Sequence, residues 1–264
     1  MQIRFIRAEI CLMLGLIAAL AFACFGPTMA QYDHYHEFAN QRAWVGLPFV
    51  LDVLSNLPFA LFGGWGLWLL HRGETTVPTG TQRALAFLFF GGLVLTAACS
   101  SWYQLHPSDL RLVVDRLGMV VAFAGLLGIA VANRIRDKAG LSVAASAIVF
   151  GSLAVATWAA NGNLLPWSAF QVSGMLLVVL LSWRKPAAEG WDVPLMAVVG
   201  WYTLAKVLEL NDGIVFWVSG DLVSGHTLKH LAAAMAAFPI ISVMHNGAEV
   251  SRQHMSSVHD LSMQ

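Results

Sequence analysis

Two long apolar runs are separated by the stretch Ser100-Ser-Trp-Tyr-Gln-Leu-His-Pro-Ser-Asp-Leu-Arg-Leu-Val-Val-Asp-Arg-Leu-Gly-Met119. This stretch carries hydroxyl, amide, imidazole and carboxylate groups, which are expensive to bury beside a bilayer. A cluster of such groups at one membrane depth therefore predicts a functional site. The apolar runs on either side predict helices that leave and re-enter a membrane, so the stretch also decides the fold class.

The composition is typical of an integral membrane protein. Of 264 residues, 58% are hydrophobic and 11% are charged, whereas soluble domains contain about 25% charged residues. The formal net charge of zero gives no indication of nucleic-acid binding. Cys11, Cys24 and Cys99 lie in apolar runs without paired spacing, which excludes a disulfide framework and a cysteine zinc site. We expect all three to be inert core residues.

The hydropathy pattern predicts an all-α, polytopic transmembrane helix bundle. A spanning helix needs about 20 mostly apolar residues, and eight segments reach or approach this length: 8–27, 47–70, 84–103, 112–132, 141–160, 164–183, 193–209 and 227–245. The seventh is the shortest. The chain is thereby divided into an N-terminal transmembrane helix or signal anchor (1–30), a seven-helix membrane domain (31–246) and a polar cytoplasmic tail (247–264). A signal peptide that is cleaved after Ala30 is the alternative for the first segment.

The basic residues predict the orientation, because Lys and Arg accumulate on the cytoplasmic side of a membrane. Arg4 and Arg7 place the N-terminus inside. The predicted inner loops are basic, with Arg72, Arg83, Arg134, Arg136, Lys138, Arg184 and Lys185. The outer loops are acidic or neutral by comparison. We therefore expect both termini to be cytoplasmic.

This topology places many polar residues near the outer leaflet: Asp52, Ser55, Asn56, Ser100, Gln104, Asp115, Lys206, Glu209, His226, Lys229 and His230. Independent crossings would rarely agree in this way without a shared site. Asp115 is expected to open the fourth helix, where the helix dipole favours a carboxylate. The alternative is a helix-end charge that pairs with Arg111 or Arg116.

His226 and His230 are four residues apart, so on a helix they share a face and can bind one metal ion. The alternative is a pair of interfacial histidines bonded to backbone or lipid headgroups. Catalytic zinc usually takes three protein ligands, so a third donor is needed. His106 precedes Pro107, which disfavours helix there, and it cannot face one metal together with Gln104 from an unbroken helix.

Asp52, Ser55 and Asn56 have helical spacing, and Pro58 predicts a kink that exposes backbone carbonyls. These three side chains could orient a ligand or bind a headgroup. They could equally form a hydrogen-bonded cluster that only joins helices.

Several motifs in order resemble the bacterial members of the alkaline ceramidase family, within a superfamily of seven-helix membrane hydrolases. They are Phe38-Ala-Asn-Gln-Arg42, Asp52-Val-Leu-Ser-Asn-Leu-Pro-Phe59, Ser100-Ser-Trp-Tyr103, Arg111-Leu-Val-Val-Asp-Arg-Leu117, Ala205-Lys-Val-Leu-Glu209 and Ser224-Gly-His-Thr-Leu-Lys-His230. The resemblance extends from about Tyr35 to Val243. It implies a hydrolase of sphingolipid metabolism in a bacterial inner membrane.

The resemblance also implies site residues. His226 and His230 would bind Zn²⁺, which activates a water molecule. Asp115 would accept the proton of that water, and Ser100 would stabilise the developing oxyanion. Asp52, Ser55, Asn56, Lys206 and Glu209 are expected to line the site.

One expected ligand is replaced. The family pattern Tyr-His-Leu-x-Pro reads Tyr103-Gln-Leu-His-Pro107 here, so Gln104 stands where a third zinc-binding histidine is expected. A neutral amide is a poor zinc ligand beside imidazole. Three outcomes follow: His106 substitutes as the ligand, Gln104 binds the metal weakly, or the metal is absent. Phe49 and Gly118 also depart from the pattern, where asparagine and proline are expected.

The sequence therefore predicts a zinc-dependent membrane amidohydrolase that acts on ceramide-like or other long-chain N-acyl lipids. The alternative is a catalytically impaired, lipid-binding relative that lacks zinc because of Gln104. A transporter or proton relay is disfavoured, since no inverted repeat is visible. In each hydrolase-like case the expected partner is a membrane lipid.

Overall fold

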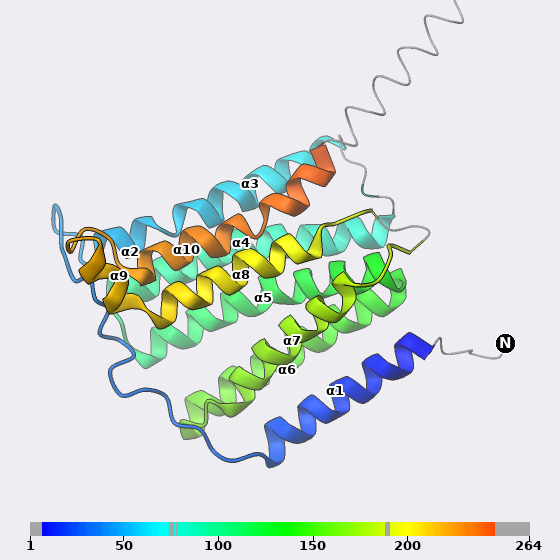
Figure 1. The fold of residues 1–264 in the computed structure, drawn as a ribbon, viewed down its shortest axis with the longest axis horizontal. Helices are drawn as coiled ribbons and strands as arrows, with labels where there is room; N and C mark the ends of the chain where they lie inside the picture. Colours follow the sequence, from blue (N-terminus) through cyan, green and yellow to red (C-terminus); the bar gives the residue numbers. More distant parts are fainter. Residues whose placement is uncertain (1–6, 74–76, 78, 188–190, 246–264) are drawn as a thin grey trace, which may run out of the picture.

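The computed structural model describes residues 7–73, 77, 79–187 and 191–245, and every regular element within them is a helix. The predicted tail, 247–264, lies outside the described residues. The helices are α1 (Arg7–Phe25), α2 (Val50–Leu54), α3 (Leu57–Arg72), α4 (Gly80–Leu105), α5 (Asp109–Arg134), α6 (Asp137–Asn161), α7 (Leu165–Ser182), α8 (Leu195–Leu210), α9 (Asp212–Val218) and α10 (Gly225–Met235). The long helices run side by side (Figure 1), which confirms the predicted all-α bundle.

Each of the eight predicted segments contains a helix. Seven spans in the described residues are long and apolar enough to cross a membrane, among them α1, the combined α2 and α3 (Val50–Arg72) and the C-terminal span Gly225–His245. The remaining predicted segment forms α8. This helix has only 16 residues, which is fewer than the about 20 residues that a spanning helix needs. The chain is an integral membrane protein.

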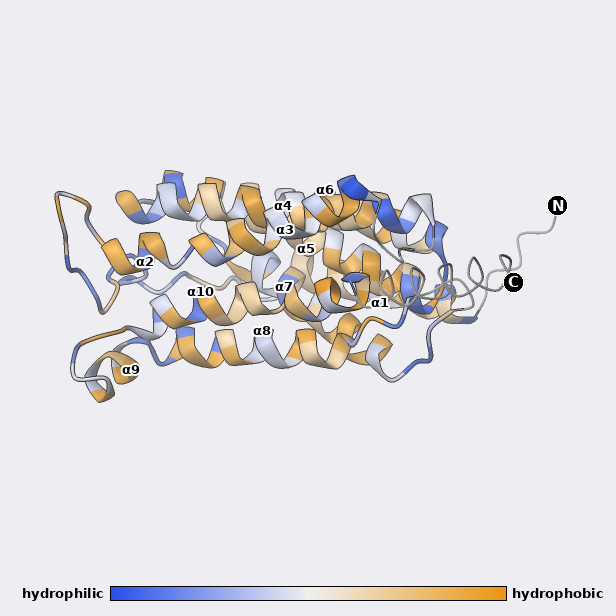
Figure 2. Ribbon diagram, turned by 90° about the horizontal axis from the view of Figure 1, so that it is seen from above, coloured by the Kyte–Doolittle hydropathy of each residue, from blue (hydrophilic) through white to orange (hydrophobic). Residues whose placement is uncertain are grey.

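The loops gather at the two ends of the bundle (Figure 1). One end carries the loop 26–49, the turn between α4 and α5, and α9. The other end carries the connections from α3 to α4, α5 to α6 and α7 to α8, which are the basic loops. In Figure 2 the long helices are mostly coloured hydrophobic, and hydrophilic residues concentrate toward the ends.

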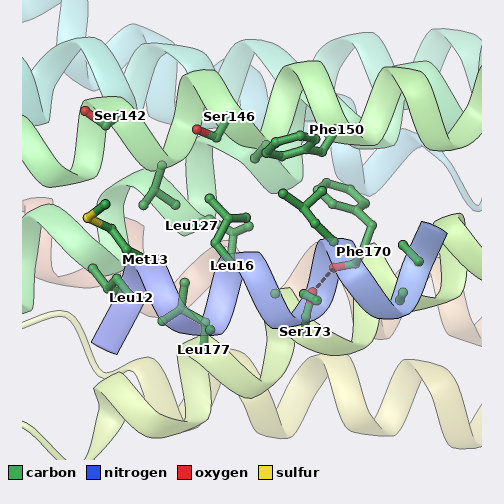
Figure 3. A pocket seen from close by; sticks show the side chains of 18 of the residues that line it. Leu12, Met13, Leu16, Leu127, Ser142, Ser146, Phe150, Phe170, Ser173 and Leu177 are labelled. Atoms are coloured by element: carbon green, nitrogen blue, oxygen red, sulfur yellow. Dashed lines mark hydrogen bonds between the residues drawn. The ribbon is translucent and has the colours of Figure 1, made fainter. Parts of the chain in front are cut away.

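Helix α1 is set apart from the other helices (Figure 1). Of its 19 residues only Glu9 is buried. A cavity of about 1220 Å³ lies between α1 and the helices α6 and α7, and apolar side chains from both sides face it (Figure 3). Cys11 and Cys24 on α1 are exposed and Cys99 is half-buried, so the prediction of core cysteines was wrong. All three are free, as the spacing predicted.

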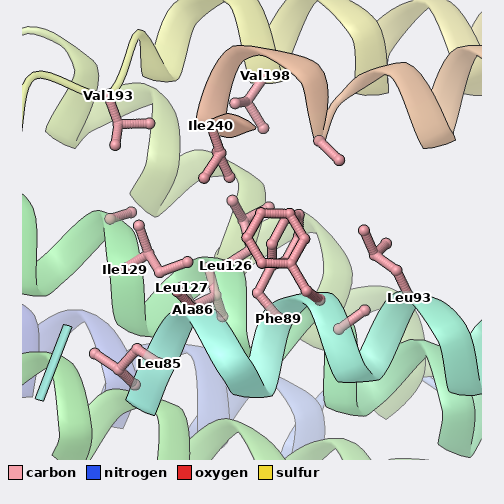
Figure 4. Packing of buried hydrophobic residues seen from close by; sticks show 14 of the residues in the cluster. Leu85, Ala86, Phe89, Leu93, Leu126, Leu127, Ile129, Val193, Val198 and Ile240 are labelled. Carbon is pink, nitrogen blue, oxygen red and sulfur yellow. The ribbon is translucent and has the colours of Figure 1, made fainter. Parts of the chain in front are cut away.

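The core lies between α4, α5 and their neighbours. Figure 4 shows Phe89 and Leu93 of α4 with Leu126 of α5, packed below Val198 of α8 and Ile240 of the last span. Glycines let α4 and α5 approach closely: a Cβ atom added at Gly92 would lie 2.4 Å from the backbone nitrogen of Ala122. This close packing aligns the ends of α4 and α5, where the predicted site residues lie.

The predicted kink is confirmed as a break between two helices. Helix α2 ends at Leu54 and α3 begins at Leu57, with Pro58 in its first turn. Proline is tolerated there because the first helical N–H groups have no partner within the helix. The break leaves backbone carbonyls of α2 free to accept hydrogen bonds from Ser55 and Asn56.

Candidate functional site

Nine buried polar residues from four segments lie near the end of the bundle that carries α9. We call them the polar cluster: Asp52, Ser55 and Asn56 from the α2–α3 break, Ser100 and Gln104 from α4, Asp115 from α5, and His226, Thr227 and His230 from α10. Each has a relative exposure of 8% or less, and Asp52 and Gln104 are fully buried. Buried polar groups are expensive unless they are paired, so their hydrogen bonds define what the cluster can do.

Local signals position the residues that form the centre of the cluster. Helix α4 continues to Leu105, which keeps Ser100 and Gln104 one turn apart on one face. Ser224 caps α10 by accepting a hydrogen bond of 3.0 Å from the backbone N–H of Thr227. Because α10 starts there, His226 and His230 share a face at its first turns.

The amide of Gln104 is held in one orientation. Asn56 Nδ2 donates to the backbone oxygens of Asp52 (3.0 Å) and Val53 (3.3 Å), so this end of Asn56 is its donor end. The same nitrogen lies 2.6 Å from Gln104 Oε1. The oxygen of Gln104 is therefore directed to Asn56, and its nitrogen is directed away from Asn56.

Gln104 Nε2 faces both histidines of α10. It lies 3.2 Å from His226 Nε2 and 3.3 Å from His230 Nε2. An amide NH₂ group has two hydrogens and no acceptor capacity, so it can donate one hydrogen bond to each ring. The structure thus brings together the three residues that the sequence placed at one metal site.

The protonation of His230 follows from its other ring nitrogen. Ser55 Oγ donates to the backbone oxygen of Asp52 over 2.6 Å, so its hydrogen is already used. His230 Nδ1, 2.7 Å from Ser55 Oγ, must then donate, and Nε2 of the neutral ring accepts from Gln104. The ring of His226 stacks against Phe38 with centroids 4.1 Å apart.

These donors do not fit the zinc site that the resemblance implies. Two imidazole nitrogens converge on one point, but the third group offers amide hydrogens and not an acceptor lone pair. Asn56 opposes a reversal of the amide, because two donors would then face each other. No group of three His, Cys, Asp or Glu side chains in the described part of the chain is arranged to hold a metal ion.

His106 does not replace the missing ligand. It follows the last residue of α4 and is exposed, whereas Gln104 is fully buried among the histidines. Of the three outcomes that the sequence left open, substitution by His106 gains no support, because the unbroken end of α4 directs Gln104 and not His106 toward the histidines.

Asp115 lies further from the start of its helix than predicted. Helix α5 begins at Asp109 and not near Asp115, so the expected N-terminal position was wrong. Asp115 is buried and hydrogen-bonded to Ser100. The alternative of a helix-end ion pair is not found either: Arg116 donates to Gln31 over 2.7 Å, and Arg111 donates to the backbone oxygen of Trp102. Ser100 and Asp115 therefore form a pair within the polar cluster.

The residues of the α2–α3 break bind side chains of α4 and α10 in the polar cluster. Ser55 contacts His230, Asn56 contacts Gln104, and Asp52 Oδ1 accepts a hydrogen bond of 2.6 Å from Thr227. The interhelical hydrogen bonds of one interpretation from the sequence are present, and the other, in which these side chains orient a ligand, stays a prediction.

Lys206 and Glu209 belong to a separate ion-pair group beside the polar cluster. Glu209 bridges Lys206 of α8 (2.6 Å) and Lys229 of α10 (2.7 Å). Lys229 lies between the two histidines in sequence, so the pair joins α8 to the helix that carries them. Lys206 and Glu209 therefore help to hold α8 against α10.

Sequence reasoning missed three contributors. Asp212 accepts hydrogen bonds from the backbone N–H of His226 (2.6 Å) and of Ala39 (2.9 Å), which fastens the loop 26–49 to α10. Phe38 covers His226. His36 contacts the Tyr103 hydroxyl at 2.8 Å. Phe38 stands in a quoted motif, but no local pattern shows these partners.

We expect Asn56→Asp to destabilise the protein by about 1–3 kcal/mol, because an ionised carboxylate would face three acceptor oxygens in place of a donor. Thermal unfolding in detergent measures the effect. Asn161→Asp is the matched control, since Asn161 uses its side-chain oxygen to accept from Asn163 N and a carboxylate keeps that bond. Equal melting temperatures for the two variants would contradict the assigned orientation of Asn56.

Comparisons with known proteins give no family for this chain: no protein-family model matches the sequence, and no curated protein is significantly similar to it.

Proposed function

We propose that the polar cluster binds the amide group of a long-chain N-acyl lipid of the ceramide type, and that Gln104 keeps the site free of zinc. The protein would then be a lipid-binding relative of the membrane amidohydrolases that it resembles. The observation that carries the proposal is the Gln104 amide, which donates toward both histidine Nε2 atoms while Asn56 holds its oxygen.

Unpaired buried oxygens support the choice of ligand. Asp52 Oδ2, Asn56 Oδ1 and Asp115 Oδ1 are buried and accept no hydrogen bond within the described residues. Such atoms are rare in native proteins and need a water, an ion or a ligand. An N-acyl amino alcohol has one N–H and at least one O–H donor, which is the chemistry that these acceptors require.

The membrane setting supports a lipid. The polar cluster lies near one end of the bundle (Figure 1), where an amide at headgroup depth can meet it while the acyl chain stays between the helices. The basic loops lie at the opposite end, and basic loops favour the cytoplasmic side. We therefore place the site near the outer leaflet and, with α8 as an eighth crossing beside the other helices (Figure 1), both termini in the cytoplasm.

Binding of a fluorescent long-chain ceramide to the protein in nanodiscs tests the proposal. We expect saturable binding without release of fatty acid, and at least about tenfold weaker binding by Asp115→Ala, because a lost hydrogen bond to a charged group contributes about 1.5–3 kcal/mol. Asp33→Ala is the control, since Asp33 is exposed in the loop at the same end of the bundle. Equal binding by wild type and Asp115→Ala would refute the site.

The hydrolase itself is the second candidate, and the convergence of His226 and His230 on one point favours it. In that case Asp115 would act as the proton acceptor and Ser100 would donate to the developing oxyanion. The same nanodisc samples distinguish the candidates. Fatty-acid release by the wild type that a chelator abolishes would establish the hydrolase and exclude the zinc-free site.

A further inference from the structure

Helix α1 is attached to the bundle by polar contacts near its two ends, and a cavity separates it from the bundle between them. At its start Glu9 forms an ion pair with Arg136. Past its end, Met29 N donates to Asn163 Oδ1 over 3.1 Å, and Met29 O accepts from Leu164 N over 2.7 Å. Between these two attachments lies the cavity of about 1220 Å³. It exceeds the about 300–1000 Å³ of ordinary small-molecule pockets.

The walls of this cavity are apolar along most of its length. Figure 3 shows Leu12 and Leu16 of α1 directed toward Leu177 of α7 and Leu127 of α5, with Phe150 and Phe170 further along. In a bilayer, such a volume is filled by acyl chains or by another helix, because water has no polar partners there.

The two ends of the cavity differ in charge. At the end near the start of α1 the lining contains the basic residues Arg7, Arg136, Lys138 and Arg184, with Glu9 as the acidic residue. Arg136 is paired with Glu9, while no ion pair is found for Arg7, Lys138 or Arg184 within the described ranges. At the other end the polar lining residues Asn161 and Asn163 are neutral.

We propose that this cavity is a binding site for an anionic phospholipid. Its phosphate lies among Arg7, Lys138 and Arg184, and its acyl chains extend along the apolar walls between α1 and the α6–α7 pair. Basic pockets between transmembrane helices recognise anionic headgroups in this manner. The site is separate from the polar cluster, which lies at the opposite end of the bundle, and does not depend on the function proposed for it.

Native mass spectrometry tests the site, with the full chain titrated by phosphatidylglycerol and by phosphatidylcholine of the same acyl chains. We expect phosphatidylglycerol to bind the wild type more tightly. The double variant Lys138→Gln/Arg184→Gln should weaken it by roughly 25-fold, about fivefold for each cation removed. Arg72→Gln/Lys185→Gln is the charge-matched control, because both residues are exposed at the same end of the bundle and neither lines the cavity. It should bind like the wild type.

A second pair of variants tests the acyl-chain part of the site without a change of charge. Ser146→Phe fills the cavity from α6 and should reduce phosphatidylglycerol binding at least about fivefold, whereas Val149→Phe, on the same helix outside the cavity, should not. Melting temperatures of all variants verify that they are folded.

Each of the following results would overturn the proposal: equal affinity for the two phospholipids, an unchanged affinity in Ser146→Phe, a dimer without bound lipid, or a purified chain whose mass lacks α1. A dimer without lipid would show that a second copy of the chain fills the cavity. Loss of α1 would show that one wall of the cavity is removed. Glycerol phosphate, which has no acyl chains, should compete only weakly, and equal competition would likewise contradict a lipid site.

Discussion

Gln104→His is expected to raise the zinc content of the purified protein to about one ion per chain, while the wild type stays far below that value. Three imidazoles would then face one point, which is the number of protein ligands in catalytic zinc sites. In the wild type the amide nitrogen of Gln104 stands at this point, 3.2 and 3.3 Å from the two histidine nitrogens, and offers only hydrogens.

Elemental analysis of protein purified at neutral pH measures the zinc, and release of fatty acid from a labelled ceramide measures activity. We expect Gln104→His to gain both and the added variant His226→Ala to lose both. Gln82→His is the matched control: Gln82 is also buried on α4, but it lies at the other end of the bundle. One zinc per chain in the wild type would contradict the role of Gln104. No zinc in Gln104→His would mean that residue 104 is not the ligand position.

Gly92→Leu is expected to destabilise the bundle by about 3 kcal/mol or more, at the upper end of the range for overpacked cores. A Cβ atom at this position would lie 2.4 Å from Ala122 N and 2.5 Å from Ala122 Cα. These are backbone atoms of α5, so the clash can be relieved only if α4 and α5 move apart. That movement would also separate Ser100 from Asp115.

Gly91→Leu, at the neighbouring residue, is the control. An added Cβ atom there meets nothing within 4 Å, and leucine favours a helix over glycine by up to about 1 kcal/mol. We therefore expect Gly91→Leu to melt at or above the wild-type temperature and Gly92→Leu to melt far below it or fail to fold. Similar melting temperatures would show that α4 and α5 do not pack through Gly92.

The local parts of the site were predictable from the sequence. The spacing of His226 and His230 and the one-turn separation of Ser100 from Gln104 depend only on helical geometry, and both are confirmed. The break before Pro58 follows from the missing N–H of proline. The zinc and the substrate class rest on the resemblance and stay predictions.

The positions of side chains within their helices and their hydrogen-bond partners were less predictable. Asp115 was expected at a helix start because the apolar run begins near it, but α5 extends back to Asp109, since polar residues also form helix beyond an apolar span. The contacts of His36 with Tyr103 and of Asp212 with Ala39 join residues far apart in the sequence. No periodicity or motif encodes such contacts.

The sequence by itself determined that the chain is a membrane-embedded helix bundle and that polar groups collect at one end, because hydropathy and helical spacing are local properties. Only the tertiary structure decided how the stretch Ser100–Met119 meets α10. The orientation of the Gln104 amide depends on Asn56, 48 residues earlier, and on His226, 122 residues later. Whether two histidines face a ligand position or a hydrogen-bond donor is therefore decided by packing, since the hydrogen bonds that fix the amide come from three different helical segments.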